Sequence, residues 1–185
     1  MYTLVKKIHE KPKIKYECFN YELNYYYLST QPNCKAKNLK EFKKKFFDDI
    51  IRCEEASLDK YEDDEDDEEE QLRTEGWYPY SLHCLGKEKF LKELERLYCT
   101  PLNGQWTNVY INLNPYYIDS KPHYAHVKFD KTPSIVELLY AHSSIWQNFY
   151  RNETQKDIDN INHHYEIIKM HGNRYTLIFE PLMAS

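Results

Sequence analysis

The chain has 185 residues, of which 41% are hydrophobic and 16% aromatic, and its formal net charge at pH 7 is −5. This length fits one domain, and the aromatic content excludes disorder over the whole chain, because disordered chains are poor in aromatic residues. No run of about 18 apolar residues occurs and the amino terminus has no apolar signal, so we expect no membrane segment.

The first elements are predicted between residues 14 and 61. Apolar and polar residues alternate over residues 14–27 with the period of a half-buried strand, and the phase switches in mid-run, which indicates a β-bulge or two strands joined by a bend. Asn38 followed by Glu41 has the form of a capping box, and apolar residues then repeat at helical spacing. A helix is therefore predicted over residues 38–61. The nine adjacent acids at 62–70 repel one another and predict a solvated loop or a frayed helical extension.

Further strand signals follow in the second half of the chain. Alternation, or a short apolar run between turn residues, predicts strands at 77–85, 109–113, 123–129, 165–170 and 174–179. The last two predict a hairpin around a turn at Gly172-Asn173.

Two more helices are predicted. One is short, begins after Gly86 and places its apolar residues up to Tyr98 on one face. The other opens at Thr132-Pro133-Ser134, where Ser134 and Glu137 offer a capping box. Its apolar stripe consists of Ile135, Leu138, Leu139, His142, Ile145, Trp146 and Phe149.

The order of these elements predicts an α+β fold. We expect a single domain over residues 1–185, with a mostly antiparallel sheet and about three helices packed on one of its faces. Residues 62–75 are predicted to form an acidic loop inserted within this domain.

Motifs of common enzymes are absent. The sequence has no phosphate-binding glycine loop, no dinucleotide fingerprint and no His-Glu-x-x-His pair, and it contains only four glycines, so we expect no cofactor and assign no catalytic residue. The five cysteines are scattered without a Cys-x-x-Cys pair, which indicates reduced thiols, and hence the cytoplasm or the nucleus. His83 and Cys84 are neighbours on a predicted strand, so they would face opposite ways and could not act as a base and its nucleophile.

A metal site is disfavoured for the same geometric reason. His123 and His126 are three residues apart on a predicted strand, which sends their side chains to opposite faces. We therefore predict no metal ligands. The acidic run supplies oxygen donors, but it lacks the glycine and the spaced acids of a calcium loop.

Charge is divided into two opposed blocks. Residues 1–47 carry 11 Lys and 4 Glu, residues 48–75 carry 15 acids against three basic residues, and the other 110 residues are balanced. The heavy use of Lys, Asn, Ile and Tyr is typical of an AT-rich genome and hints at a parasite, a large DNA virus or a phage.

The acidic block predicts a protein-binding segment. Its negative charge would suit a basic protein surface or imitate a nucleic-acid backbone, whereas the alternative is a charge run that is merely solvated. The residues concerned are Glu62, Asp63, Asp64, Glu65, Asp66, Asp67, Glu68, Glu69 and Glu70.

The lysine block predicts contacts with nucleic acid. Lysines that reach phosphate, interleaved with aromatic rings on which bases stack, are the chemistry of RNA and single-strand binding. The alternative is a solvated lysine face that pairs in part with the acidic run. The predicted binding residues are Lys6, Lys7, Lys11, Lys13, Lys15, Lys40, Lys43, Lys44, Lys45 and Tyr25.

The two charge blocks together favour a non-catalytic binding factor that docks onto a large nucleoprotein assembly. A ribosome offers both RNA phosphate and basic protein surface, so a ribosome-associated regulator of the dormancy or inhibition type is the leading hypothesis. The second hypothesis is a virus- or phage-encoded inhibitor whose acidic tract mimics nucleic acid. The third is a small hydrolase or nuclease that depends on His and Cys or on carboxylates.

Overall fold

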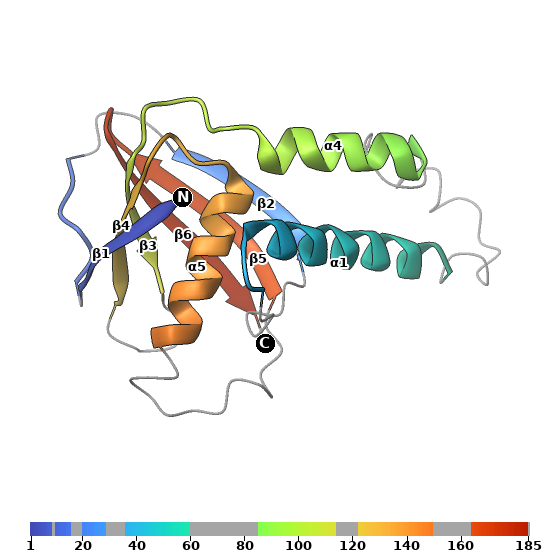
Figure 1. Ribbon diagram of the computed structural model, residues 1–185, viewed down its shortest axis with the longest axis horizontal. Coiled ribbons are helices and arrows are strands. Elements are labelled where there is room, and N and C mark those ends of the chain that lie inside the picture. Colours follow the sequence, from blue (N-terminus) through green and yellow to red (C-terminus); the bar gives the residue numbers. More distant parts are fainter. Residues whose placement is uncertain are drawn as a thin grey trace.

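A computed structural model describes residues 1–8, 10–15, 20–28, 36–59, 85–113, 122–149 and 164–184 of the chain (Figure 1). Of residues 20–28, 53, 56–59, 164–167 and 182–184, it describes the backbone alone. Six strands and three helices lie in this part of the chain. The strands are β1 Tyr2–Ile8, β2 Asn20–Leu28, β3 Asn108–Asn112, β4 Tyr124–Phe129, β5 His164–Gly172 and β6 Thr176–Ala184. The helices are α1 Leu39–Asp59, α4 Lys87–Cys99 and α5 Ile135–Phe149.

The six strands form one sheet in the order β1-β4-β3-β6-β5-β2. Neighbouring strands are antiparallel except β3 and β6, which are parallel. All three described helices lie to one side of this sheet (Figure 1). The prediction of an α+β fold with a mostly antiparallel sheet and about three helices on one face is therefore confirmed.

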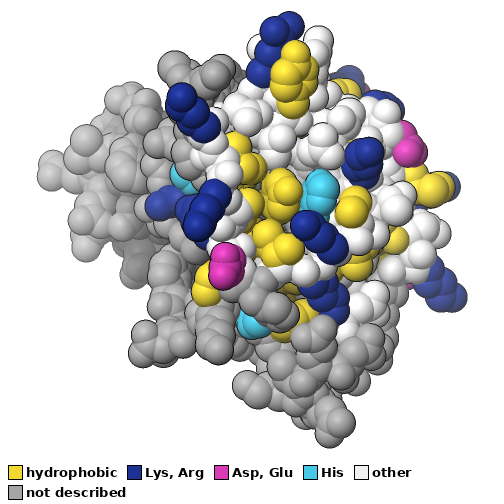
Figure 2. All heavy atoms as spheres, turned by 90° about the vertical axis from the view of Figure 1, so that its left-hand side faces the viewer, with side chains coloured by type: hydrophobic (Ala, Val, Ile, Leu, Met, Phe, Trp, Pro, Cys, Tyr) yellow, Lys and Arg dark blue, Asp and Glu magenta, His cyan; other side chains and the backbone are white. Residues whose placement is uncertain are grey.

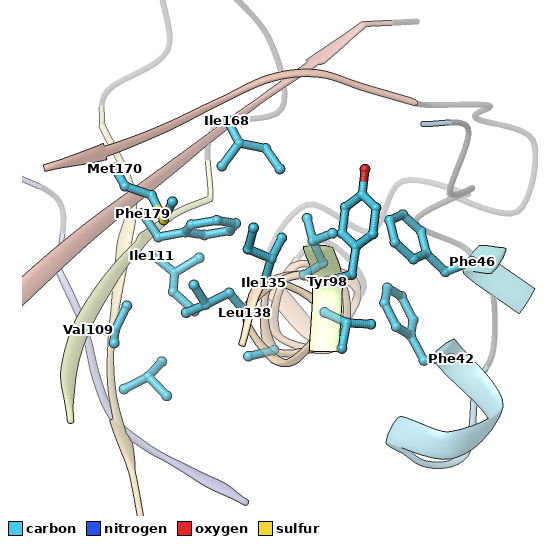
Figure 3. Packing of buried hydrophobic residues seen from close by; sticks show 14 of the residues in the cluster. Phe42, Phe46, Tyr98, Val109, Ile111, Ile135, Leu138, Ile168, Met170 and Phe179 are labelled. Carbon is cyan, nitrogen blue, oxygen red and sulfur yellow. The ribbon is translucent and has the colours of Figure 1, made fainter. Parts of the chain in front are cut away.

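Helix α5 lies between the sheet and the other two helices (Figures 1 and 3). On its sheet side Leu138 lies near Val109 and Ile111, and on its other side it meets Phe42 of α1 and Tyr98 of α4 in the same hydrophobic cluster. Because both sides are covered, its buried residues extend beyond the predicted stripe to Val136, Ala141 and Ser143. The predicted stripe itself is buried throughout.

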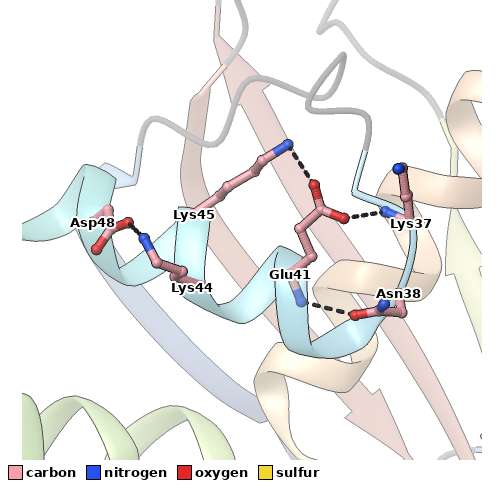
Figure 4. A network of polar contacts seen from close by, with 6 residues as sticks. All are labelled: Lys37, Asn38, Glu41, Lys44, Lys45 and Asp48. Carbon is pink, nitrogen blue, oxygen red and sulfur yellow. Dashed lines mark hydrogen bonds and ion pairs between the residues drawn. The ribbon is translucent and has the colours of Figure 1, made fainter.

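Capping residues define where two helices begin. Ser134 and Glu137 form the predicted capping box, since the Ser134 N–H donates to Glu137 Oε2 at 2.8 Å and the Glu137 N–H donates to Ser134 Oγ at 3.4 Å. At α1 the Glu41 N–H donates to Asn38 Oδ1 at 2.9 Å (Figure 4). The Glu41 carboxylate, however, accepts from the N–H of Lys37 at 2.9 Å, one residue earlier than a regular box requires.

Strand β1 was not predicted. Its Leu4-Val5 and Lys6-Lys7 pairs interrupt alternation, because the register with β4 shifts between Leu4 and Lys6 and leaves Val5 as an extra residue. The prediction of a strand beginning at residue 14 was wrong for residues 14 and 15, which are not in a strand, whereas β2 confirms the alternation that follows. The expected acidic loop and the loop at 152–162 lie outside the described residues. So do residues 77–84 of the strand predicted at 77–85, and that prediction was wrong for Leu85, which is helical.

The carboxy-terminal hairpin is confirmed, but its turn lies one residue later than predicted. Strand β5 continues through Gly172, and Asn173 Oδ1 accepts from the N–H groups of Tyr175 and Thr176 at 3.0 and 2.9 Å. An asparagine side chain that bonds to the backbone two and three residues on is a common way to build a turn. A Cβ on Gly172 would lie 2.7 Å from the Thr176 carbonyl oxygen, so a larger residue would displace this turn.

Replacing Leu139 with alanine should lower the free energy of unfolding by about 3 kcal/mol, because the side chain is fully buried in α5 and its removal leaves a cavity. Urea denaturation measures this change. Leu4→Ala is the matched control, since Leu4 is 41% exposed and should lose much less. Equal losses for the two variants would contradict the described packing of α5.

Stability should fall in mild acid because of His142. Burial lowers the pKa of this fully buried histidine from 6.5 to about 3, against the opposing effect of a hydrogen bond with the backbone of Asn112. Below pH 6.5 the unfolded chain therefore binds a proton that the folded protein does not, so stability decreases as pH falls from 6.5 toward 3. Between pH 7 and pH 5 this group should remove about 2 kcal/mol.

Urea denaturation of the wild type and of His142→Leu at both pH values tests the origin of that loss. The variant lacks the titrating group. Its loss of stability between pH 7 and pH 5 should therefore be smaller than that of the wild type by about 2 kcal/mol. An unchanged pH dependence would contradict the assignment.

Candidate nucleic-acid interface on the open face of the sheet

The predicted lysine block is divided between two sides of the molecule. Three of its members lie on α1 and form ion pairs, and we call them the helix-layer lysines: Lys43, Lys44 and Lys45. Lys44 lies 2.6 Å from Asp48 and Lys45 lies 3.1 Å from Glu41, each within the same helix (Figure 4). These contacts are the side-chain pairs that commonly cover a solvated helix face.

Lys43 connects two helices. Its Nζ lies 2.5 Å from Glu95 Oε1 of α4, and this bond raises the pKa of Lys43 and lowers the pKa of Glu95. The contact gives Lys43 a structural role at the α1–α4 junction. Lys40 is exposed on the same helix, and no ion pair joins it to another described residue.

The other predicted lysines lie at the opposite side of the sheet or along its edge. Lys6 and Lys7 belong to β1, which is an edge strand, and Lys11, Lys13 and Lys15 follow in residues 10–15. Lys11 Nζ lies 3.2 Å from Glu180 Oε1 on β6, which joins Lys11 to the sheet. Figure 2 shows the side away from α1 and α4, where Lys and Arg side chains gather and few acids lie among the described residues.

The sheet register shows which side chains lie on the face of the sheet turned away from the helices, which we call the open face. Val109, Ile111, Ala125 and Val127 are fully buried against the helices, so the residues that alternate with them point the other way. Residues directly opposite one another in an antiparallel pair lie on the same face. The open face of the first strands therefore carries Lys6, Asn108, Tyr110, Asn112, Tyr124, His126 and Lys128.

Tyr110 and His126 form a stacked pair on this face. They lie opposite one another on β3 and β4, with ring centres 4.5 Å apart and planes inclined by 10°. Lys6 is opposite His126 on the other flank, and Lys128 is two residues along β4. Burial lowers the pKa of His126, and the charges of Lys6 and Lys128 lower it further, so the ring is neutral at pH 7.

A second group on the open face is centred on Glu180, whose side chain is 13% exposed. Its carboxylate accepts from the Tyr124 hydroxyl at 2.7 Å, and His171 Nε2 lies 2.8 Å from its Oε2. Burial alone would raise the pKa of Glu180, but the bonds from Tyr124 and Lys11 and the charges of Lys11 and His171 lower it overall. Three titratable side chains, Lys11, Tyr124 and His171, thus surround a carboxylate that stays ionised.

We call Lys6, Lys13, Lys15 and Lys128 the sheet-side lysines. All four are exposed, and within the described part of the chain no ion pair joins any of them to an acid. Lys7 differs, because it points to the helix side, opposite Ala125, and its Nζ lies 5.0 Å from the centre of the Phe149 ring. Lys11 differs because it is bound to Glu180.

The remaining predicted residues belong to β2 or lie outside the described residues. Tyr25 lies in β2, at the sheet edge opposite to β1, and its side chain is not among those described. The acidic residues 62–70 lie outside the described residues, as do His83 and Cys84. Sequence analysis missed Tyr110 and Lys128, and considered His126 only as a metal ligand. These residues could have been found from the sequence, because they are the ones that alternate with the buried residues in 108–112 and 124–128.

The positions of His123 and His126 agree with the prediction that their side chains lie on opposite faces of a strand. The His123 ring lies 4.9 Å from Phe149 of α5, whereas His126 stacks on Tyr110, so the two imidazoles point to opposite sides of the sheet as predicted. Burial is the main cause that raises the pKa of Cys99 to about 11, so this thiol is protonated at neutral pH and is a poor nucleophile.

No known protein family, curated protein or solved structure matches this chain. Within the described ranges, no group of three or more His, Cys, Asp or Glu side chains could hold a metal ion. No helix among the described residues is long and apolar enough to cross a membrane.

Replacing Glu180 with glutamine should lower the free energy of unfolding at pH 7 by about 2 kcal/mol, because it removes a largely buried carboxylate that receives charged hydrogen bonds. The pKa of Glu180 is lowered in the folded protein, so its stabilisation is complete above 4.5 and is lost as pH falls through the lower folded value. The difference from the wild type should therefore shrink below pH 4.5.

Urea denaturation at pH 7 and at pH 3 measures both effects. Glu88→Gln is the matched control, since this glutamate also pairs with a lysine but its side chain is 86% exposed. A loss at Glu88 as large as that at Glu180 would show that burial of the carboxylate is not what matters.

Proposed function

We propose that the protein is a non-catalytic binding factor that contacts RNA phosphate through its sheet-side lysines as part of a large nucleoprotein assembly. A ribosome-associated regulator of the dormancy or inhibition type, acting in the cytoplasm, is the concrete form of this proposal. The observation that carries it is the contrast between the two sets of lysines. The helix-layer lysines are held by Glu41, Asp48 and Glu95, whereas the sheet-side lysines are exposed and form no ion pair with an acid in the described part of the chain.

Electrostatics supports the choice of a polyanionic partner. An ammonium group without an acidic neighbour keeps its full field, and several such groups on one side raise the rate and the strength of binding to phosphate. The lowered pKa of His126 reports positive potential at this place, since Lys6 and Lys128 contribute to the shift after burial. The helix-layer lysines are largely neutralised by neighbouring acids, so they add little to such a field.

The acidic residues 62–70 have a separate part in this proposal. Nine adjacent acids would dock onto basic protein, and ribosomal surfaces offer such protein beside RNA. An inhibitor of a basic host protein would use the same residues without the sheet-side lysines. The two functions are therefore distinguished by whether binding depends on these lysines or on the acidic segment alone.

Replacing Lys6, Lys13 and Lys15 together with glutamine should weaken binding to ribosomes and to RNA by about tenfold or more at low salt. The salt dependence, taken as the slope of log affinity against log salt concentration, should become shallower by about 2, because each lost phosphate contact on a single strand contributes about 0.7. Sedimentation with ribosomes through sucrose at two salt concentrations, and fluorescence anisotropy with labelled RNA, measure these effects.

The triple variant of Lys43, Lys44 and Lys45 is the matched control, because it removes the same number of charges from ion-paired sites. It should retain most of the affinity. Equal losses in the two variants would show that net charge, and not the open face, governs binding. A wild-type protein that stays at the top of the gradient at both salt concentrations would end the ribosome proposal.

A further inference from the structure

We infer that the open face binds single-stranded RNA by stacking a base on the Tyr110–His126 pair, with adjacent phosphates on Lys6 and Lys128. This inference rests on the proposed function and makes its ligand specific. It concerns which part of the nucleic acid is recognised, whereas the sheet-side lysines alone would accept any phosphate backbone.

The aromatic pair is suited to a base because its two rings are already parallel. With centres 4.5 Å apart and planes inclined by 10°, Tyr110 and His126 form a short stack that a third flat ring can extend. Both residues are half-buried, so each is held in place yet part of each remains accessible. A neutral imidazole carries no ammonium-like hydration shell that would have to be removed, and the pKa of His126 is lowered by burial and by the neighbouring lysines.

The lysines are at the right places for the backbone of the same strand. Lys6 is directly opposite His126, and Lys128 is two residues farther along β4, which corresponds to about 7 Å along an extended strand. This spacing is within reach of the base and phosphate of one nucleotide and its neighbour. Bases are free to stack on protein only where they are not paired, so the ligand is a single strand or a loop rather than a duplex.

Polar groups around the pair can contact base edges. Asn108 and Asn112 flank Tyr110 along β3 and lie on the same face, and an amide side chain offers both a donor and an acceptor. Tyr110 is covered by His126 on its β4 side, and on its β6 side it is opposite the fully buried Ile178, so the stack can be extended only on the face of His126 that points toward β1. Lys6 lies on this side as well.

The test compares three probes by fluorescence anisotropy: a short labelled oligouridine, an abasic ribose–phosphate strand of equal length and charge, and an RNA duplex. The wild type should bind oligouridine more tightly than either of the other two. His126→Ala should weaken oligouridine binding about tenfold, the usual effect of removing a base-stacking ring, and leave the abasic strand unchanged. Lys128→Gln should weaken binding of both strands.

Two further variants separate stacking from folding. His126→Phe keeps a flat ring and should bind oligouridine like the wild type, and His126→Leu keeps apolar bulk without a ring and should behave like His126→Ala. Thermal unfolding of each variant shows whether the fold is retained.

The possible failures are distinct. Equal binding of oligouridine and the abasic strand, with no effect of His126→Leu, overturns base stacking and leaves the phosphate-binding proposal standing. Preference for the duplex also overturns base stacking. Failure of the wild type to bind any of the three probes removes both proposals.

Discussion

The packing of α5 is the constraint on which the rest of the molecule depends. This helix is covered by the sheet on one side and by α1 and α4 on the other, so it must be apolar on most of its circumference. The one titratable group that it buries completely, His142, can be kept there only in its neutral form. Because α1 and α4 pack on α5, the described helices stand on one face of the sheet (Figure 1). The other face carries polar, aromatic and basic side chains on β3 and β4, and the fully buried Ile178 on β6.

Local rules predicted the helices well, because caps and periodicity are written in adjacent residues. Ser134 with Glu137, and Asn38 with Glu41, mark helix starts that the structure contains. The strands were predicted where alternation is regular, as in β3 and β4. The pairing of β3 with β6 could not be predicted, because these strands are parallel neighbours from distant parts of the sequence. No pattern of neighbouring residues encodes such a contact.

The candidate site shows the same limit more clearly. In the sequence, the lysines from Lys6 to Lys45 form one block, but folding sends them to opposite sides of the sheet. Acids within reach then decide which of them stay available, and Lys43 meets Glu95 only because α1 and α4 come together. Alternation showed that His123 and His126 point to opposite faces. It could not show that Tyr110 would lie beside His126, because this depends on the register between β3 and β4.

The composition of the edge strand β1 has two consequences. An edge strand with exposed apolar residues such as Leu4 and Val5 invites pairing with another strand, and proteins prevent this with bulges and lysines. Here Val5 interrupts the register, and Lys6 and Lys7 follow it directly. The bulge disturbs the regular row of backbone groups that an added strand would need, while the charges repel a second copy of the same edge. The same features therefore make β1 a poor site for strand addition. Lys6 thus protects the edge and also places positive charge beside the Tyr110–His126 pair.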